Sequence, residues 1–204
     1  MEKTVYFRSF EEEDAALIYK WMNDDELKKK SVGVNRRMCR DEALDWVKAR
    51  MRDSRSQVFW AICSIDTHEM IGYMSLNNIH YINRSAEFGG LVIGNHNYQD
   101  GIAWMESYLF LYEYAFERLV MNRVYGTHLV EHTSSNFMGS IFFAQREGVL
   151  RQAFFKDGIF HDAVIGSLLR EDYMAHKERG DYELEAVMKR MIKKIRDTKK
   201  IRHA

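Results

Sequence analysis

Proline is absent from all 204 residues, so no element boundary can be located from a proline and a rigid proline-rich linker is excluded. Cysteine occurs only twice, as Cys39 and Cys63, without the spacing of metal ligands. Cys63 lies in an apolar run, which predicts a buried thiol, whereas Cys39 is expected at the surface. Because so few cysteines are typical of a reducing compartment, we expect a cytoplasmic protein.

The sequence also lacks long apolar runs, and its formal net charge is zero. No apolar run approaches the ~20 residues of a membrane-spanning helix, and the opening MEKTVYFRSFEEED has no apolar signal region. The 30 basic and 30 acidic residues cancel, so the whole-molecule field gives no strong nucleic-acid signal. His128 and His132 fall across the expected end of a strand rather than on one helix face, which disfavours zinc. We therefore expect a soluble protein without a membrane span or a metal.

The residues that are present suit one packed domain. Hydrophobic residues make up 46% of the chain, enough for a sizeable core. Apolar periodicity predicts helices over 11–22, 40–51, 102–119, 134–143 and 182–202. Alternation and short apolar runs predict strands over 5–9, 58–65, 70–76, 86–93, 123–129, 149–155 and 160–168. An Asp-Gly turn joins the last two strands. This order predicts an α/β fold of mixed α+β type, with helices flanking a central, mostly antiparallel sheet.

The most informative stretch is LVIGNHNYQDGIA, from Leu91 to Ala103. In it an apolar strand ends in a polar turn, and a glycine precedes a helix. The first turn of a helix leaves N–H groups unpaired and carries the positive end of the dipole, so such a turn can bind a phosphate. An ordinary capped turn would have the same sequence. Asp100 would repel a phosphate unless its carboxylate turns outward as the helix cap.

The C-terminal segment has an apolar stripe on a basic helix. The stripe comprises Leu184, Val187, Met188, Met191, Ile192 and Ile195, and the basic residues are Lys189, Arg190, Lys193, Lys194, Arg196, Lys199, Lys200 and Arg202. This pattern predicts a helix packed on its own domain or on the same helix of a homodimer. A membrane surface, RNA or an acidic partner is the alternative for the basic face. We assign residues 1–173 to the main domain and 174–204 to a basic amphipathic extension.

The order of elements and three segments resemble the GNAT superfamily of acetyl-CoA-dependent N-acetyltransferases. The segments are FRSFEEEDAALIYKWMND, IGYMSLNNIHYINRSAEFGGLVIG and EGVLRQAFFKDGIFHDAVIGSLLREDY, and the resemblance extends from Val5 to Tyr173. Within the superfamily it is nearest to the ribosomal-protein-alanine and polyamine acetyltransferases. It implies a GNAT-like fold and transfer of an acetyl group from acetyl-CoA to a primary amine. The acceptor would be a protein N-terminus, a polyamine or an amino sugar.

The resemblance also implies where acetyl-CoA binds. In this superfamily the strand corresponding to 86–93 parts from its neighbour, so main-chain groups of Leu91, Val92 and Ile93 would hold the pantetheine arm. The turn that follows would wrap the pyrophosphate, through Tyr98, Gln99, Asp100, Gly101, Ile102 and Ala103. The family pattern is Gln/Arg-x-x-Gly-x-Gly/Ala, and this turn is one residue shorter.

A second departure concerns the family segment Glu-Asn-x-x-Ser and the tyrosine that follows it. Aligned without gaps, His132 replaces the asparagine and Gly139 the tyrosine. A shifted alignment uses Asn136 as the asparagine and puts a phenylalanine at the tyrosine position. Neither alignment supplies the hydroxyl that protonates the leaving thiolate. Ser135 and Asn136 are expected cofactor contacts, and His132 is either a proton carrier or a loop residue.

Amine acetylation also needs a base. An amine of pKa ~10 is charged at pH 7, and its deprotonation costs about 4 kcal/mol. Glu87, on the strand that leads to the cofactor turn, is the candidate. It is alternatively a structural carboxylate paired with Arg84 or Arg123. The acidic residues 24–26 either cap a helix or attract a cationic amine.

The short turn and the missing hydroxyl also support a second interpretation. In it the chain is a non-catalytic CoA-binding or protein-interaction module.

Overall fold

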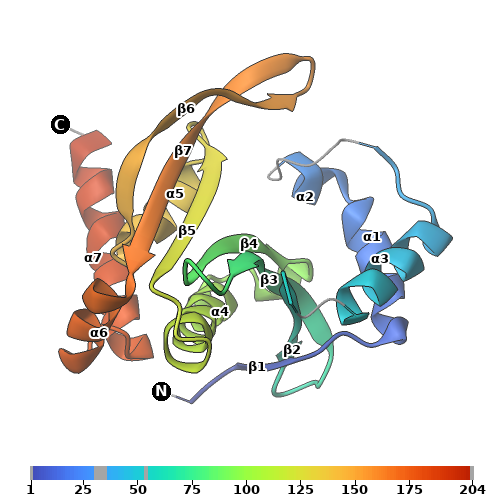
Figure 1. The fold of residues 1–204 in the computed structure, drawn as a ribbon, viewed down its shortest axis with the longest axis horizontal. Helices are drawn as coiled ribbons and strands as arrows, with labels where there is room; N and C mark the ends of the chain where they lie inside the picture. Colours follow the sequence, from blue (N-terminus) through green and yellow to red (C-terminus); the bar gives the residue numbers. More distant parts are fainter. Residues whose placement is uncertain (1, 30–35, 53–54, 203–204) are drawn as a thin grey trace.

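The computed structural model describes residues 2–29, 36–52 and 55–202, the last five without their side chains. Seven strands form one sheet in the order β1-β2-β3-β4-β5-β7-β6 (Figure 1). They are β1 (Val5–Arg8), β2 (Val58–Ser64), β3 (Met70–His80), β4 (Ser85–Ile93), β5 (Arg123–Leu129), β6 (Gln145–Lys156) and β7 (Ile159–Leu169). Among the described residues, only β4 and β5 pair in parallel, which confirms the predicted mixed, mostly antiparallel sheet.

Helices cover both faces of the sheet (Figure 1). One face carries η1 (Glu12–Asp14), α1 (Ala15–Met22), α2 (Asp25–Lys29) and α3 (Arg40–Arg52). The other carries α4 (Ile102–Glu113) with its π-helical end η3 (Tyr114–Arg118), α5 (Thr133–Ile141), α6 (Arg170–Glu178) and α7 (Leu184–Arg202). A short turn, η2 (His96–Tyr98), precedes α4. We call these the α1–α3 face and the α4 face.

The two faces enclose two separate cores. Alternation along β3 sends Tyr73 into the core under α1 and α3, and its neighbour Met74 into the larger core under α4. The same alternation on β4 sends Val92 toward the α1–α3 face, and Leu91 and Ile93 toward the α4 face. The sheet therefore separates two apolar layers, and each β4 side chain can be assigned to one of them.

Parallel strands β4 and β5 separate soon after they meet. Their pairing consists of Ser85 with Arg123, Ala86 with Val124 and Glu87 with Tyr125. Beyond that point β4 pairs only with β3, and β5 only with β7. We call this opening, between residues 88–93 of β4 and 126–129 of β5, the strand fork. It confirms the parting expected from the resemblance.

The β6–β7 hairpin is longer than predicted and leans toward α2 (Figure 1). Asp157 and Gly158 form its turn with φ values of 51° and 85°, the left-handed conformations that a tight turn needs. Near the tip, Lys156 Nζ donates a hydrogen bond of 2.8 Å to the carbonyl of Lys29. The hairpin thus connects the far edge of the sheet to the α1–α3 face.

At the opposite edge, a buried carboxylate holds β1. Glu106, on α4 and 6% exposed, accepts hydrogen bonds of 2.9 Å from the main-chain N–H groups of Thr4 and Val5. Its Oε2 also accepts one of 3.0 Å from the Thr4 hydroxyl. Because buried carboxylates are costly unless their oxygens are satisfied, this cluster ties the start of the chain to α4.

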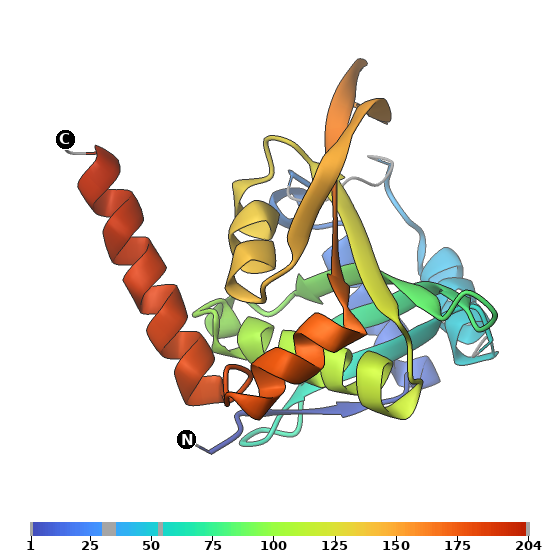
Figure 2. The ribbon, with the colours of Figure 1, turned by 60° about the vertical axis from the view of Figure 1, so that its left-hand side comes forward.

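The C-terminal part contains a helix that the periodicity does not predict. In α6 only Tyr173 is buried, so no apolar stripe marks this helix in the sequence. The expected boundary between 173 and 174 falls inside it. Val187 of α7 is fully buried, and α7 packs on α4 and α5 of its own chain before rising away from the fold (Figure 2). The basic residues Lys199, Lys200 and Arg202 lie outside the described side chains.

The two cysteines lie where the sequence predicts them, with Cys63 buried and Cys39 exposed. None of the helices in the described residues is both long and apolar enough to cross a membrane.

Candidate functional site

The end of β4 is held tightly from the α1–α3 face. A Cβ at Gly94 would lie 2.2 Å from the ring of Trp21, so only glycine allows α1 to pack this closely on the strand. In the next turn, His96 Nε2 lies 3.2 Å from Asp24 Oδ2. These contacts fix the turn after β4 relative to the first helices.

The N-terminus of α4 lies next to the strand fork. Gly101 is the N-cap and has φ 95°, a conformation that favours glycine. Asp100, the residue before the N-cap, accepts a 2.9 Å hydrogen bond at Oδ1 from the Ile102 N–H, so its carboxylate is directed at the first turn of the helix. The N–H groups of Ala103 and Trp104 belong to the same first turn, which an α-helix leaves without intrahelical partners. Together with the helix dipole, they suit a phosphate.

Other residues of this turn bond within the chain. Gln99 Nε2 donates a 3.1 Å hydrogen bond to the carbonyl of Ile93, at the end of the strand fork. The Tyr98 hydroxyl donates one of 3.2 Å to Ser64 Oγ, so this side chain points toward β2. Ala103 is a buried residue of the core under α4. The turn can therefore act through main-chain groups, as the resemblance implies.

Glu87 lies on the α1–α3 face, at the base of the strand fork. Its neighbour Phe88 stacks on Tyr108 of α4, with ring centroids 4.5 Å apart, so Glu87 points to the opposite face. Asn78 Nδ2 donates a 2.6 Å hydrogen bond to Glu87 Oε2. Arg123 pairs instead with Glu147. Among the described residues, Glu87 forms no ion pair with Arg123 or Arg84, so a neutral amide is its hydrogen-bond partner.

Tyr125 is a candidate that the sequence interpretation missed. It is the parallel partner of Glu87 at the last pair before the strand fork. Burial and the charge of Glu87 raise the pKa of the Tyr125 hydroxyl, while Arg123 and a hydrogen bond with Asn78 partly oppose this. The phenol is therefore protonated at neutral pH. Only the register of β4 against β5 reveals this pair, and no local sequence pattern specifies it.

Two buried polar atoms lie on the same face. Ser75 is 1% exposed, and its Oγ has no hydrogen-bond partner within the described chain; the same holds for Asn77 Oδ1. Asn77 pairs with Glu87 across β3 and β4, which puts both side chains on the α1–α3 face. A Cβ at Gly89 would lie 2.1 Å from Ser75 Oγ. Buried acceptors without partners are costly, so this face is suited to a ligand or water that donates hydrogen bonds.

The segment after β5 is braced internally. Ser135 Oγ lies 2.8 Å from His132 Nδ1, and Asn136 Oδ1 lies 3.0 Å from His128 Nε2. Asn136 Nδ2 donates to the carbonyl of Val130 at 3.1 Å. The two histidines thus have different partners. In the part of the chain that the structure describes, no group of three or more His, Cys, Asp or Glu side chains could hold a metal.

The acidic residues 24–26 favour the capping interpretation. Asp24 Oδ1 accepts hydrogen bonds from the N–H groups of Glu26 and Leu27, at 2.8 and 3.1 Å. The bond from Leu27, followed by the contact with His96, lowers the pKa of Asp24. Asp25 and Glu26 pair with Arg37 and Lys29, respectively. The charges of this group are therefore already paired.

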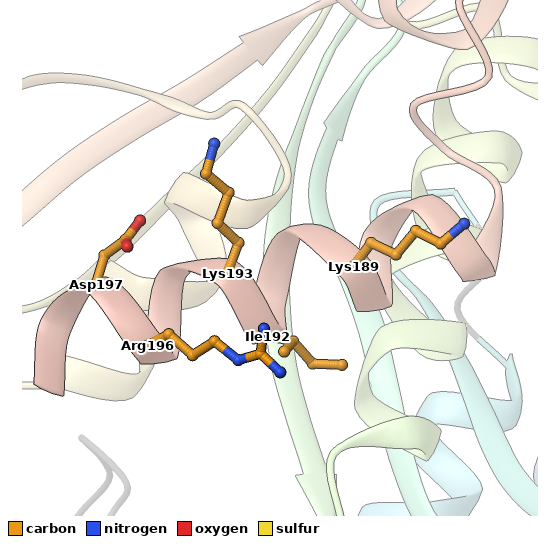
Figure 3. A pocket seen from close by; sticks show the side chains of 5 residues that line it. All are labelled: Lys189, Ile192, Lys193, Arg196 and Asp197. Carbon is orange, nitrogen blue, oxygen red and sulfur yellow. The ribbon is translucent and has the colours of Figure 1, made fainter.

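Two open surface depressions lie on other elements. One, of about 380 Å³, is lined by α7 residues Lys189, Ile192, Lys193, Arg196 and Asp197 (Figure 3). The other, of about 760 Å³, is lined by hairpin residues Val149, Leu150, Arg151, Gln152 and Asp162. Neither depression is lined by residues of the strand fork.

Comparisons with known proteins agree with this geometry. A family model, the acetyltransferase (GNAT) domain, matches residues 4–138. An uncharacterized N-acetyltransferase of Bacillus subtilis (strain 168), YoaA, is 25% identical over 165 residues, which cover 80% of this chain and 92% of the relative.

Solved structures share the fold. The spermidine N-acetyltransferase from Vibrio cholerae, in complex with CoA and spermine, superimposes with a TM-score of 0.75 at 21% identity. That match covers 84% of this chain and 98% of the other. A GCN5-related N-acetyltransferase from Brucella melitensis has a TM-score of 0.75 at 17% identity, over 90% of this chain and 84% of the other.

Proposed function

The chain belongs to the GNAT acetyltransferase family, and on that basis we propose that it transfers an acetyl group from acetyl-CoA to a primary amine. The observation that carries the proposal is the strand fork, which opens directly onto the N-terminus of α4 and has Glu87 at its base. The similarity to a spermidine N-acetyltransferase makes a polyamine a reasonable first acceptor to test. A peptide N-terminus and an amino sugar remain acceptors to test beside it.

The residues at the strand fork fit acetyl-CoA in a specific way. β4 beyond Phe88 lacks a strand partner on its β5 side, so its main-chain groups there are available to the pantetheine amides. The first-turn N–H groups of α4 fit the pyrophosphate. Acetyl-CoA supplies the acetyl group as a reactive thioester. The chain's own residues have to supply the proton transfers.

We assign the base to Glu87. Its carboxylate accepts a hydrogen bond from Asn78 and has no cationic partner in the described residues, so it can receive the proton of an incoming ammonium group, directly or through water. Asn77 Oδ1 and Ser75 Oγ, on the same face, can accept further hydrogen bonds from that group. The nitrogen then forms the C–N bond to the acetyl carbon as the C–S bond breaks.

We assign the acid to Tyr125, which replaces the hydroxyl missing after β5. Its phenol is protonated at neutral pH and sits at the base of the strand fork, from which it can give a proton to the departing sulfur. Glu87, its register partner, holds the proton taken from the amine. The nitrogen of an ammonium group loses two protons in becoming an amide. Glu87 releases the first of them to solvent and passes the second through water to Tyr125, which restores both groups.

A titration calorimetry experiment with acetyl-CoA, desulfo-CoA and ATP tests the binding site. We expect micromolar binding of the first two and none of ATP. A thiol-release assay with spermidine, an alanine peptide and a nucleotide-linked amino sugar then tests catalysis. Glu87→Gln should lower kcat by about 10²–10⁴-fold, whereas Glu69→Gln, in the exposed β2–β3 turn, should not. CoA binding without turnover of any amine would instead favour the non-catalytic module.

A further inference from the structure

The charge of this chain is unevenly distributed. Of its 30 basic and 30 acidic residues, eight basic residues and one acidic residue lie between 189 and 202, in helix α7. The rest of the chain therefore has an acidic excess of seven. Such asymmetry is typical of chains that bind a polyanion through a basic segment. The zero net charge of the whole chain conceals this segment.

Helix α7 is packed along one side only. Val187 is fully buried, and Met191 Cε lies 3.8 Å from the position of a Cβ at Gly101. Beyond these contacts the helix rises away from the fold (Figure 2). With about 3.6 residues per turn, Lys189 and Arg196, two and nine residues after Val187, project from the opposite side. Both are exposed, so we call this side of α7 its outward side.

The outward side carries cations that face solvent. Lys193 and Arg196 are exposed and form no ion pair within the described residues. Lys189 pairs with Glu185 at 2.8 Å, but both side chains are largely exposed, so the pair is weak. The three cations line one open depression (Figure 3). They span about 10 Å of helix axis, a length over which one strand of a duplex carries about three phosphates.

A membrane surface fits this helix less well than a nucleic acid. A helix that lies on a membrane buries its apolar side in the bilayer interface. The apolar side of α7 already packs on α4 and α5. In the described part of α7, the large apolar side chains that remain exposed are Ile192 and Ile195.

A second copy of the chain also fits poorly, because two outward sides that met in a symmetric dimer would oppose like charges. Residues 189–202 contain no aromatic residue to stack on an unpaired base, and no asparagine or glutamine to recognise an adenine edge. Contacts to phosphates, which do not depend on base sequence, are what this surface offers.

We propose that the outward side of α7, through Lys189, Lys193 and Arg196, binds the phosphate backbone of a nucleic-acid duplex without sequence preference. This surface lies on a different element from the strand fork, so it adds a binding function to the proposed acetyl transfer. The acidic excess of the remaining chain disfavours other orientations, so the duplex approaches the protein from the side of α7.

The test is fluorescence anisotropy with labelled RNA and DNA duplexes of about 20 base pairs and identical sequence, from about 50 to 200 mM salt. The logarithm of the binding constant should fall against the logarithm of salt with a slope of about −0.9 per phosphate contacted, or about −2.7 for three contacts. The two duplexes should bind within about threefold of each other, and a larger preference would contradict a contact made through phosphates alone.

Paired variants test the residues. Lys193→Gln combined with Arg196→Gln should reduce the slope by about 1.8 and weaken binding at low salt roughly 10- to 100-fold. Lys20→Gln combined with Arg52→Gln makes the same charge change at exposed positions of α1 and α3, and should stay within about threefold of the wild type. Asp197→Asn removes the anion that lines the same depression and should tighten binding about threefold, a gain that misfolding does not produce.

Wild-type affinity in the Lys193 and Arg196 double variant, or no binding of either duplex by the wild type at low salt, would overturn the inference. Vesicles of phosphatidylcholine and phosphatidylserine, and light scattering, test the other occupants. Binding to vesicles but not to duplexes, or a dimer that dissociates in the double variant without any duplex binding, would also overturn it. Thermal unfolding checks that each variant folds. CoA titration of the same samples reports on the proposed function separately.

Discussion

Gly101 offers a direct test of how the α4 N-terminus serves the cofactor. At φ 95° an L-residue is strained by roughly 1–2 kcal/mol, and a β-branched residue by at least as much. The added Cβ itself meets only Met191 Cε at 3.8 Å, an ordinary contact, so the cost of Gly101→Val lies in the backbone. For a chain of this size, we expect the melting temperature to fall by roughly 2–8 °C.

The backbone can relieve this strain only by rotating at the start of α4, which moves the first-turn N–H groups. Losing one hydrogen bond to a charged phosphate costs about 1.5–3 kcal/mol, so CoA affinity should fall roughly 10- to 100-fold. Calorimetry with CoA gives the affinity, and thermal unfolding gives the stability of the same samples.

Gly158 provides the matched control. It has φ 85° in the β6–β7 turn, and a Cβ there would have no neighbour within 4 Å. Gly158→Val should therefore carry a similar backbone cost and leave CoA affinity unchanged. A folded Gly101→Val protein with wild-type affinity would refute the assignment of this turn to the pyrophosphate.

Three further predictions test other contacts. Tyr125→Phe should lower kcat about 10²-fold or more with little change in the KM for acetyl-CoA; unchanged kcat would remove Tyr125 as the acid. Gly94→Ala should cost about 1–3 kcal/mol in urea unfolding, because the new Cβ would lie 2.2 Å from the Trp21 ring, and wild-type stability would contradict that packing. Arg123 lowers the pKa of Glu147 to about 2, below its unfolded value, so the pair stabilises the fold above pH ~4.3 and loses this as pH falls. Unfolding between pH 5 and 2 should be less pH-dependent in Glu147→Gln.

Local signals explain what the sequence predicts well. The Asp157–Gly158 turn requires two left-handed residues, and Asp-Gly is one of the few pairs that adopt them readily. The strand ending at Ile93 and the helix beginning at Ile102 are strongly apolar, and the polar turn between them is unambiguous. The candidate turn residues can therefore be located from the amino-acid sequence alone.

Strand register and weak amphipathicity explain which helices and side-chain pairs cannot be predicted from the sequence. The short helix α2 has no buried residue, so no apolar period marks it. Whether Glu87 faces Tyr125 or Arg123 depends on how β4 pairs with β5, strands separated by the whole of α4. A shift of one residue would turn the side chain to the other face. The sequence suggests possible partners of Glu87, but only the register of β4 against β5 shows that Tyr125 is the one it faces.

The tie between Glu106 and the first strand has a consequence for how the chain folds as it is made. Strand β1 is held by a side chain that lies 102 residues after Thr4 in the chain, and its strand partner is β2. Contacts this distant form slowly, because a long loop has to close before they stabilise anything. Because the chain is made from its N-terminal side, the hydrogen bonds from Thr4 and Val5 to Glu106 can form only after α4 has emerged.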